Sequence, residues 1–417
     1  MRHFLMRHFL LGGAAALALA ACGSTGPDGP PPLLSALPRP LSAAEARVSE
    51  GANRFTLALL RQALRDTPGG SNTFVSPLSV SMALAMALNG AGGETYDAMR
   101  ATLGLEALAE GEINAGYRDL IGLLDGLDGG VEMLVANAMW ARTGLELEPA
   151  FRATGEEYFG AEIATLDFGA PGAVEAINGW VAARTNDRIP RLLDAIAPDE
   201  VLFLVNAIYF KGRWREAFDV RETRPGPFAG GDGRERSAML MRQEATLRYG
   251  ETERYQAVEL LYGNGAFGMT VVLPRAGNTP AGLLESLDPS AWGELVAGLR
   301  EETVHLTLPR FRLDYSRALA PDLTALGMGV AFDDQRADFS RINRGDEPLV
   351  LTRVEHKTFV EVNEEGTEAA AATAVGVGVT SAPQVYEMTV DRPFLFTIRE
   401  RFSGTLLFAG VMNAVGE

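Results

Sequence analysis

Residues 349–363 show a strict alternation between two sets of side chains. The first set is almost entirely uncharged and comprises Val350, Thr352, Val354, His356, Thr358, Val360 and Val362. The second set is more polar and comprises Leu351, Arg353, Glu355, Lys357, Phe359, Glu361 and Asn363. A period of two residues is typical of a β-strand with one buried face. Residues 349–363 are therefore predicted to form such a strand, and residues 388–398 and 404–410 predict two more.

Residues 201–210 are apolar on both faces of a strand except at Asn206, which predicts a central strand covered above and below. Two helices are predicted nearer the N terminus. Ser42 and Glu45 form a capping box before apolar residues at helical spacing. Ser76 and Pro77 form an N-cap before a run, residues 78–88, that is apolar nearly all the way round. This second helix is expected inside the protein, and the whole pattern predicts an α+β fold with large sheets.

Residues 363–381 have the composition of a loop but the alternation of a strand. At strand period, one face carries no charge and no proline: Thr367, Ala369, Ala371, Thr373, Val375, Val377 and Val379. The other face carries Glu368, Ala370, Ala372, Ala374, Gly376, Gly378 and Thr380. Such a segment could leave solvent and enter the middle of a sheet. From these residues alone, an Ala-rich helix or a flexible linker is the alternative.

Three blocks in this part of the chain resemble the serpin family of protease inhibitors, at family-typical distances. They are Glu-Glu-Gly-Thr-Glu-Ala-Ala-Ala (364–371), Asp-Arg-Pro-Phe-Leu-Phe (391–396) and Phe-Ala-Gly-Val-Met-Asn (408–413). Further blocks are similar to serpin sequences in family order: residues 74–84, 137–140, 206–214, 308–311 and 337–340. The resemblance thus extends from Ser42 to the C terminus. Ala414 stands where the family usually has a proline, a terminal departure that leaves the mechanism unaffected.

The resemblance implies a serpin fold, with three β-sheets, about eight or nine helices and an exposed reactive-centre loop. It also implies roles for particular residues. The loop hinge comprises Glu365, Gly366, Thr367, Glu368, Ala369, Ala370, Ala371 and Ala372. A polar cluster behind the central strands, the shutter cluster, comprises Ser76, Ser79, Asn206 and His356. The breach, where loop insertion begins, comprises Lys211 and Trp214.

In serpins, a protease cleaves the loop, which then enters the main sheet and traps the protease as an acyl-enzyme. Family spacing from Gly366 implies a scissile bond at Thr380–Ser381, with Val379–Thr380 as the alternative. Thr367 is expected to be exposed before cleavage and to enter the sheet first. Residues 358–391 contain no Arg or Lys, so the expected partner is an elastase-like or subtilisin-like serine protease. The alternatives are a non-inhibitory scaffold, carrier or chaperone, and a cross-class inhibitor of cysteine proteases.

Composition and charge limit the other classes of function. The chain has 417 residues, 47% of them hydrophobic and 22% charged, which is enough to bury a sizeable core. Its formal net charge of -17 argues against nucleic acid or another polyanion as a partner. No domain boundary or internal repeat follows Ser42. Residues 42–417 are therefore predicted to form one serpin domain, and a monomer is expected.

The sequence lacks the usual catalytic and metal-binding patterns. Only two histidines, His305 and His356, follow residue 22. No nucleophile elbow, zinc-protease motif, Walker loop or dinucleotide fingerprint is present. These absences argue against an enzyme, in line with the protease inhibitor that the resemblance implies, and no cofactor and no metal are expected. His356 falls on the uncharged face of its strand, where a buried and hydrogen-bonded imidazole is expected.

Residues 1–21 have the features of a lipoprotein signal peptide. Arg2 and Arg7 precede a short, alanine-rich apolar stretch. The sequence Leu-Ala-Ala-Cys at residues 19–22 resembles the bacterial lipobox, in which Cys22 becomes the lipidated first residue. A plain secretory signal is the alternative, and Met6 is a second candidate start because residues 1–5 repeat at 6–10.

Residues 22–41 are rich in Gly, Ser and Pro, which predicts a flexible tether after the lipidated Cys22. The protein is expected to be exported and lipid-anchored to a bacterial membrane, on its periplasmic or cell-surface side, or else secreted. Because Cys22 is the only cysteine, its lipidation would leave no thiol for a disulfide. The stability of the domain is then expected to come from packing.

Overall fold

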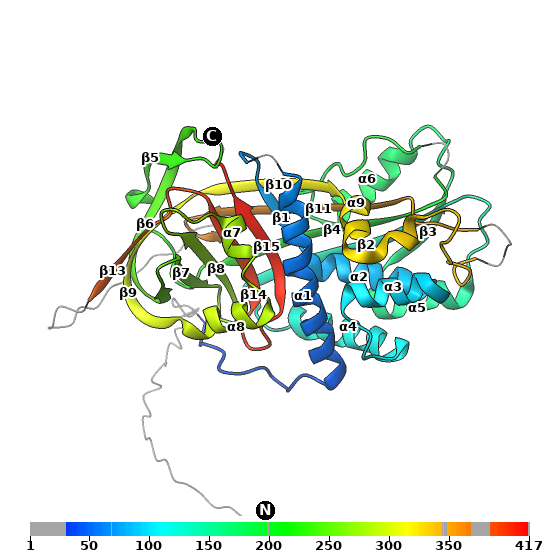
Figure 1. Cartoon of the computed structure of the whole chain (residues 1–417), viewed down its shortest axis with the longest axis horizontal. Helices are drawn as coiled ribbons and strands as arrows, with labels where there is room; N and C mark the ends of the chain where they lie inside the picture. Colours follow the sequence, from blue (N-terminus) through cyan, green and yellow to red (C-terminus); the bar gives the residue numbers. More distant parts are fainter. Residues whose placement is uncertain are drawn as a thin grey trace, which may run out of the picture. The chain divides into compact units, whose positions relative to one another are not determined.

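The computed structural model describes residues 31–67, 69–197, 200–343, 345, 348–367 and 384–415, and from residue 31 onward the chain forms one compact unit (Figure 1). The described residues contain nine α-helices. They are α1 (Ala43–Arg65), α2 (Pro77–Leu88), α3 (Gly93–Leu103), α4 (Glu110–Asp125), α5 (Pro149–Phe159), α6 (Ala173–Arg184), α7 (Pro280–Leu284), α8 (Pro289–Gly298) and α9 (Ala320–Leu323).

The described strands form two hydrogen-bonded sheets. The main sheet has the order β10-β11-β12-β4-β2-β3, and the larger sheet has the order β1-β15-β14-β8-β7-β6-β9-β13, with β5 paired to β6. The strands are β1 (Thr73–Val75), β2 (Val131–Arg142), β3 (Glu162–Leu166), β4 (Leu202–Arg213), β5 (Arg224–Ala229), β6 (Glu235–Glu251), β7 (Tyr255–Leu261), β8 (Phe267–Pro274), β9 (Arg300–Pro309), β10 (Phe311–Ala318), β11 (Arg353–Asn363), β12 (Gly366–Thr367), β13 (Val385–Thr389), β14 (Phe394–Glu400) and β15 (Leu406–Met412).

The larger sheet consists of two parts that share β6. That strand pairs with β9 from Leu240 to Tyr249 but with β7 only from Arg248 to Glu251. The part formed by β5, β6, β9 and β13 is thus joined to the remaining strands through one end of β6. With the main sheet, these two parts account for the three sheets expected, and the α+β prediction is confirmed.

The strand predicted for residues 349–363 begins at Arg353 rather than at residue 349. Its neighbours explain the difference. Arg353 pairs with Phe203 near the start of β4, and β10 ends at Ala318 opposite Glu355. Residues before Arg353 have no adjacent strand to pair with, and the buried side changes there, because Leu349 and Leu351 are buried while Thr352 is exposed.

Both predicted helices are present. α1 begins with the capping box, in which the Ser42 N–H donates to the Glu45 carboxylate (2.6 Å) and the Glu45 N–H donates to the Ser42 hydroxyl (3.2 Å). α2 has Ser76 as its N-cap residue and begins at Pro77, as predicted, but the Ser76 side chain makes no capping hydrogen bond. Its hydroxyl donates instead to the carbonyl of Leu407 (2.7 Å), so the side chain ties the start of α2 to β15.

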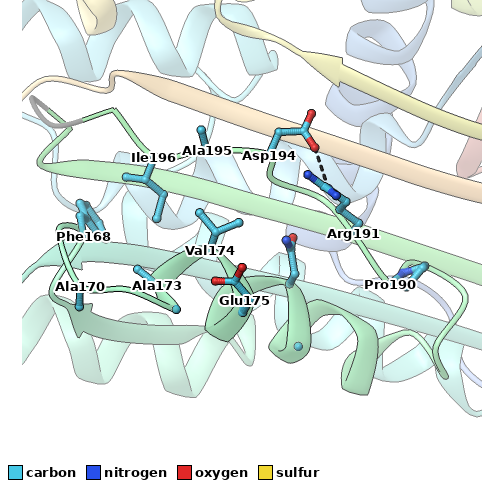
Figure 2. Close-up of a pocket in the computed structure, with 13 residues that line it drawn as sticks. Phe168, Ala170, Ala173, Val174, Glu175, Pro190, Arg191, Asp194, Ala195 and Ile196 are labelled. Carbon is cyan, nitrogen blue, oxygen red and sulfur yellow. Dashed lines mark hydrogen bonds and ion pairs between the residues drawn. The ribbon is translucent and has the colours of Figure 1, made fainter.

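One face of the main sheet is covered by α6. Phe203, Val205 and Tyr209 of β4 pack in one cluster with Ile177 and Val181 of α6. The segment that follows α6 folds back beside the helix, and the two border a pocket of about 580 Å³ (Figure 2). Alternate residues of β4 point to the opposite face, which is covered by other helices.

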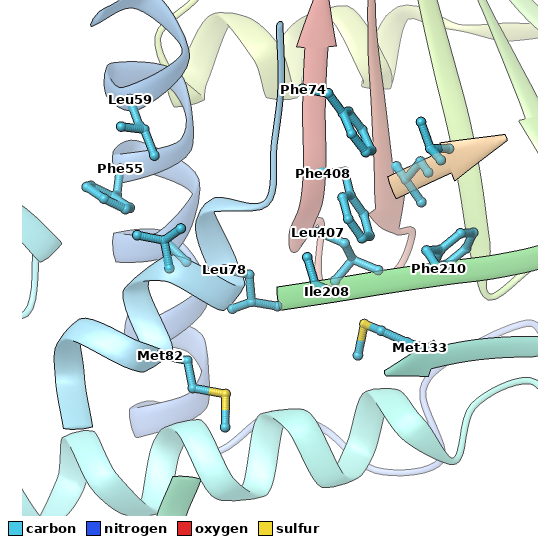
Figure 3. Packing of buried hydrophobic residues seen from close by; sticks show 14 of the residues in the cluster. Phe55, Leu59, Phe74, Leu78, Met82, Met133, Ile208, Phe210, Leu407 and Phe408 are labelled. Atoms are coloured by element: carbon cyan, nitrogen blue, oxygen red, sulfur yellow. The ribbon is translucent and has the colours of Figure 1, made fainter. Parts of the chain in front are cut away.

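The opposite face of β4 packs against α2. Figure 3 shows Leu78 of α2 near Ile208 of β4, with Leu407 and Phe408 of β15 beside them. α2 contacts both β4 and β15, so it lies between the main sheet and the larger sheet. A helix in that position needs apolar residues on every side. All of α2 is buried, which confirms the prediction of an internal helix.

Candidate functional site

The site lies where two central strands of the main sheet separate. β4 and β11 run parallel and pair directly from Phe203–Arg353 to Tyr209–Phe359. Beyond that point the two-residue strand β12 lies between them, antiparallel to both. The first residues of the hinge therefore already occupy the position of a new strand in the main sheet.

Thr367 is buried at this position, with no exposed surface. It pairs with Val362 of β11 and Gly212 of β4, and its hydroxyl is hydrogen-bonded to the hydroxyl of Tyr262 (2.8 Å). The prediction that Thr367 is exposed before cleavage is wrong. The chain reverses immediately after β11, and the separated ends of β4 and β11 leave a place for it.

Gly366 makes that reversal possible. Its φ of 152° is one that residues with a side chain rarely adopt. A Cβ there would also lie 2.1 Å from the carbonyl oxygen of Gly212, which is closer than non-bonded atoms approach. Only glycine fits between β11 and β4 at this point, as the predicted role of Gly366 in the hinge requires.

The turn before β12 is held by a buried carboxylate. Glu364 is 3% exposed, and its two oxygens accept hydrogen bonds from Nε of Arg310 (2.7 Å each). The Thr223 hydroxyl donates to the same carboxylate, and the Glu364 carbonyl accepts from the Phe218 N–H (2.8 Å). These contacts were not predicted from the sequence. Each residue lies in a serpin-like block of the sequence, Glu364 in the block at 364–371 and Arg310 in the block at 308–311.

Of the two breach residues, Trp214 lies against the hinge and Lys211 does not. The Trp214 indole N–H donates to the Asn363 carbonyl (2.9 Å), and its backbone N–H donates to the Glu365 carbonyl (2.8 Å). Its ring stacks on Tyr262, with centroids 4.5 Å apart and 15° between the planes. Lys211 is half-buried and pairs with Glu132 of β2. Strand alternation turns the Lys211 side chain away from the face that Phe210 and Gly212 share.

The four residues assigned to the shutter cluster lie together behind β4 and β11. The Ser76 N–H donates to Nε2 of His356 (3.0 Å), so Nδ1 carries the imidazole proton and donates to Oδ1 of Asn206 (2.7 Å). The Asn206 amide donates in turn to the Ser79 hydroxyl (2.5 Å) and to Oδ1 of Asn137 (2.7 Å). Asn137 of β2 was not predicted to belong to this cluster, although its amide is the only polar side chain besides the Trp140 indole in the block 137–140. The hydrogen bond between His356 and Asn206 joins β11 to β4.

Burial lowers the pKa of His356 to about 3, because no charged partner offsets the loss of hydration. The imidazole is therefore neutral at physiological pH. A protonated ring could not accept from the Ser76 N–H, so protonation would break the shutter cluster.

We expect His356 to stay neutral while His305 titrates. Hydrogen bonds to Glu244 and Glu387 raise the pKa of His305. His305 and His356 are the only histidines after residue 22. Histidine-ring NMR from pH 8 to pH 4 should show one ring that titrates above its ordinary pKa and one that does not titrate.

Since unfolded His356 takes up a proton near pH 6.5, its contribution to stability is complete above that pH. It should fall by about 1.4 kcal/mol per pH unit below it. A His356 that titrates near pH 6.5 would contradict the assignment.

Other predicted site residues lie outside the described residues: Glu368, Ala369, Ala370, Ala371, Ala372, Val379, Thr380, Ser381 and Cys22. Within the described ranges, no group of three or more His, Cys, Asp or Glu side chains could hold a metal ion. No helix in that part of the chain is long and apolar enough to cross a membrane.

Comparison with known proteins agrees with this geometry. The family model described as "Serpin (serine protease inhibitor)" matches residues 50–414. The chain is 36% identical to Iripin-2 of Ixodes ricinus over 377 residues, covering 88% of this chain and 94% of that protein. It is 32% identical to the human leukocyte elastase inhibitor, covering 87% of this chain and 98% of that protein.

Solved structures give the same result. The structure of Tengpin, a thermophilic serpin in the native state, superposes with a TM-score of 0.82 at 25% identity, covering 93% of this chain and 97% of that one. Human thyroxine-binding globulin superposes with a TM-score of 0.83 at 26% identity, covering 90% and 100%. The family match, the relatives and the fold together show that this chain belongs to the serpin family.

Proposed function

We propose that this protein inhibits serine-type endopeptidases as a suicide substrate. The observation that carries the proposal is the position of β12, since Gly366 and Thr367 already lie between β4 and β11. The chain that follows carries only small, uncharged residues on the face that would turn inward, from Thr367 to Val379. Such a face can be buried without an unpaired charge, and in the inserted strand Glu368 would belong to the other face.

In the proposed reaction, the protease serine attacks the carbonyl carbon of Thr380. The bond to Ser381 breaks, the Ser381 amine leaves with a proton from the protease's general acid, and an ester joins the protease to Thr380. The freed loop then extends β12 between β4 and β11. A strand from Thr367 to Thr380, at about 3.3 Å per residue, would carry the protease about 45 Å. Trapping requires this step to be faster than hydrolysis of the ester.

Entry of the loop has to separate strands that are now paired. The direct ladder between β4 and β11 must open, and so must the hydrogen bond between Asn206 and His356 that joins them. The lost backbone pairs are replaced when a new strand pairs with β4 on one side and β11 on the other. Separating β4 from β11 is the barrier to loop insertion, and completion of the main sheet is its driving force.

We expect elastase or subtilisin to be trapped, and trypsin to be ignored or to cut elsewhere. A small apolar S1 pocket accepts Thr380 or Val379, whereas the acidic trypsin pocket would face a neutral side chain. The name of the leukocyte elastase inhibitor, a 32% identical relative, is consistent with this choice. Thr380→Arg should move inhibition toward trypsin and leave the hinge unaltered.

Mass spectrometry of the C-terminal peptide released during complex formation identifies the bond. A peptide that begins at Ser381 shows cleavage after Thr380, and one that begins at Thr380 shows cleavage after Val379. A start outside residues 377–384 would contradict the assignment. If the protease panel yields only cleaved inhibitor and no covalent complex, a scaffold, carrier or chaperone role replaces inhibition. A complex with cysteine proteases alone would support cross-class inhibition.

We also propose that the protein is an exported bacterial lipoprotein, acting as a monomer and anchored through Cys22. The support is the lipobox-like sequence at residues 19–22 and the Gly, Ser and Pro content of residues 22–41. Fractionation of cells that express the wild type and Cys22→Ser tests this proposal. Membrane association that persists in the variant would rule out the anchor, and release of the variant would support it.

A further inference from the structure

We propose that Tyr262 is a positioning residue for loop insertion, because its buried hydroxyl holds Thr367 at the first position of the new strand. This inference rests on the proposed inhibitory function. It assigns a role to a residue outside the hinge, the shutter cluster and the breach. We call Tyr262 and the backbone around it the hinge seat, comprising Tyr262, Trp214 and Gly212.

Packing fixes the Tyr262 ring in one orientation. It stacks on Trp214 on one side and meets the ring of Phe210 edge-on, with centroids 5.2 Å apart and 65° between the planes. A Cβ on Gly212 would lie 2.8 Å from Cδ1 of Tyr262, so the ring lies directly against the β4 backbone. Trp214 and Tyr262 also form a backbone β-bridge. The hydroxyl can therefore point to only one place, and Thr367 is there.

The two hydroxyls are isolated from water. Tyr262 and Thr367 have no exposed surface, and they bind one another at 2.8 Å. Burial also raises the pKa of Tyr262, so the phenol stays protonated and can donate. Removing either hydroxyl leaves the other buried without this partner, which is unfavourable.

The position of this bond gives it a kinetic role. Gly366 and Thr367 are the first residues of β12, and their pairs with β11 and β4 begin the new strand. Each later residue of the loop can add to a strand that is already paired, whereas Thr367 has no inserted residue before it except Gly366. In cooperative structures the first step, nucleation, is the costly one. An anchored Thr367 provides that nucleus before cleavage. The hinge seat should therefore favour insertion over hydrolysis of the acyl-enzyme.

The test uses Tyr262→Phe, Thr367→Val and the double variant, each of which removes a hydroxyl and keeps the shape of the side chain. We expect each single variant to raise the ratio of cleaved inhibitor to covalent complex about fivefold, the factor that corresponds to about 1 kcal/mol. The rate of loop cleavage should not change. The double variant should be no worse than either single variant, because both lose the same bond.

Tyr249→Phe is the matched control, since it removes another buried hydroxyl, one bound to Glu251 and Gln256. It should keep the wild-type ratio. The inference would be overturned by a Tyr262→Phe variant with the wild-type ratio, or by a double variant whose effect is the sum of the two single-variant effects. Either result would leave the proposed function intact. A wild-type protein that traps none of the proteases would overturn the proposed function, and the inference with it.

Discussion

Thr367→Arg is expected to convert the protein from an inhibitor into a substrate. Protease should still cleave the loop, but covalent complexes should disappear, because a guanidinium between β4 and β11 would be a buried charge without a partner. Such a charge costs about 3–5 kcal/mol, enough to slow insertion by more than about a hundredfold. Hydrolysis of the acyl-enzyme would then win. Denaturing gels with elastase or subtilisin measure complex against cleaved inhibitor.

The burial of Thr367 adds a second consequence. Because the side chain lies inside the main sheet before cleavage, Thr367→Arg should force β12 out of the sheet and lower the melting temperature of the uncleaved protein. Thr389→Arg is a matched control, since Thr389 is exposed on β13, the strand that follows the loop. That variant should trap protease normally. If Thr367→Arg formed complexes at the wild-type ratio, the hinge assignment would be wrong.

The sequence predicted elements whose pattern is local. The alternation at 353–363, the apolar run at 78–88 and the doubly apolar strand at 202–210 each reflect which sides of one segment are covered. The start of β11 was predicted too early because the alternation of the sequence continues back to residue 349, where Leu349 and Leu351 are buried outside the described sheets. Periodicity reports burial, and pairing depends on whether a neighbouring strand is present.

Contacts between distant segments could not be predicted in the same way. Tyr262 reaches Thr367 across 105 positions of the sequence, and Arg310 reaches Glu364 across 54. Tyr262 belongs to none of the serpin-like blocks, and although Arg310 and Glu364 each belong to one, the blocks do not say which residues meet. The burial of Thr367 was also unpredictable, because the same residues fit an exposed loop or an inserted strand. The choice depends on the separation of β4 and β11, which is a property of the tertiary structure.

Cleavage of the loop near Thr380 is expected to raise the melting temperature, whereas most proteins lose stability when the chain is cut. Insertion would bury Val375, Val377 and Val379 on the inward face, and each buried valine contributes about 1.5–3 kcal/mol. The three together give roughly 5–9 kcal/mol before any new backbone pairing is counted. For a chain of this size about 1 kcal/mol shifts the melting temperature by about 2 °C. The expected rise is therefore at least about 10 °C.

The most direct test of loop insertion is calorimetry of the protein before and after clean cleavage of its loop. The cut is made near Thr380 by a protease that is not trapped, and the masses of both fragments are checked. Insertion predicts that the cleaved protein melts at least about 10 °C above the intact one. Thr367→Arg, cleaved at the same bond, should show a much smaller rise. A melting temperature that stays the same or falls after cleavage of the wild-type loop would contradict insertion, and with it the proposed inhibitory mechanism.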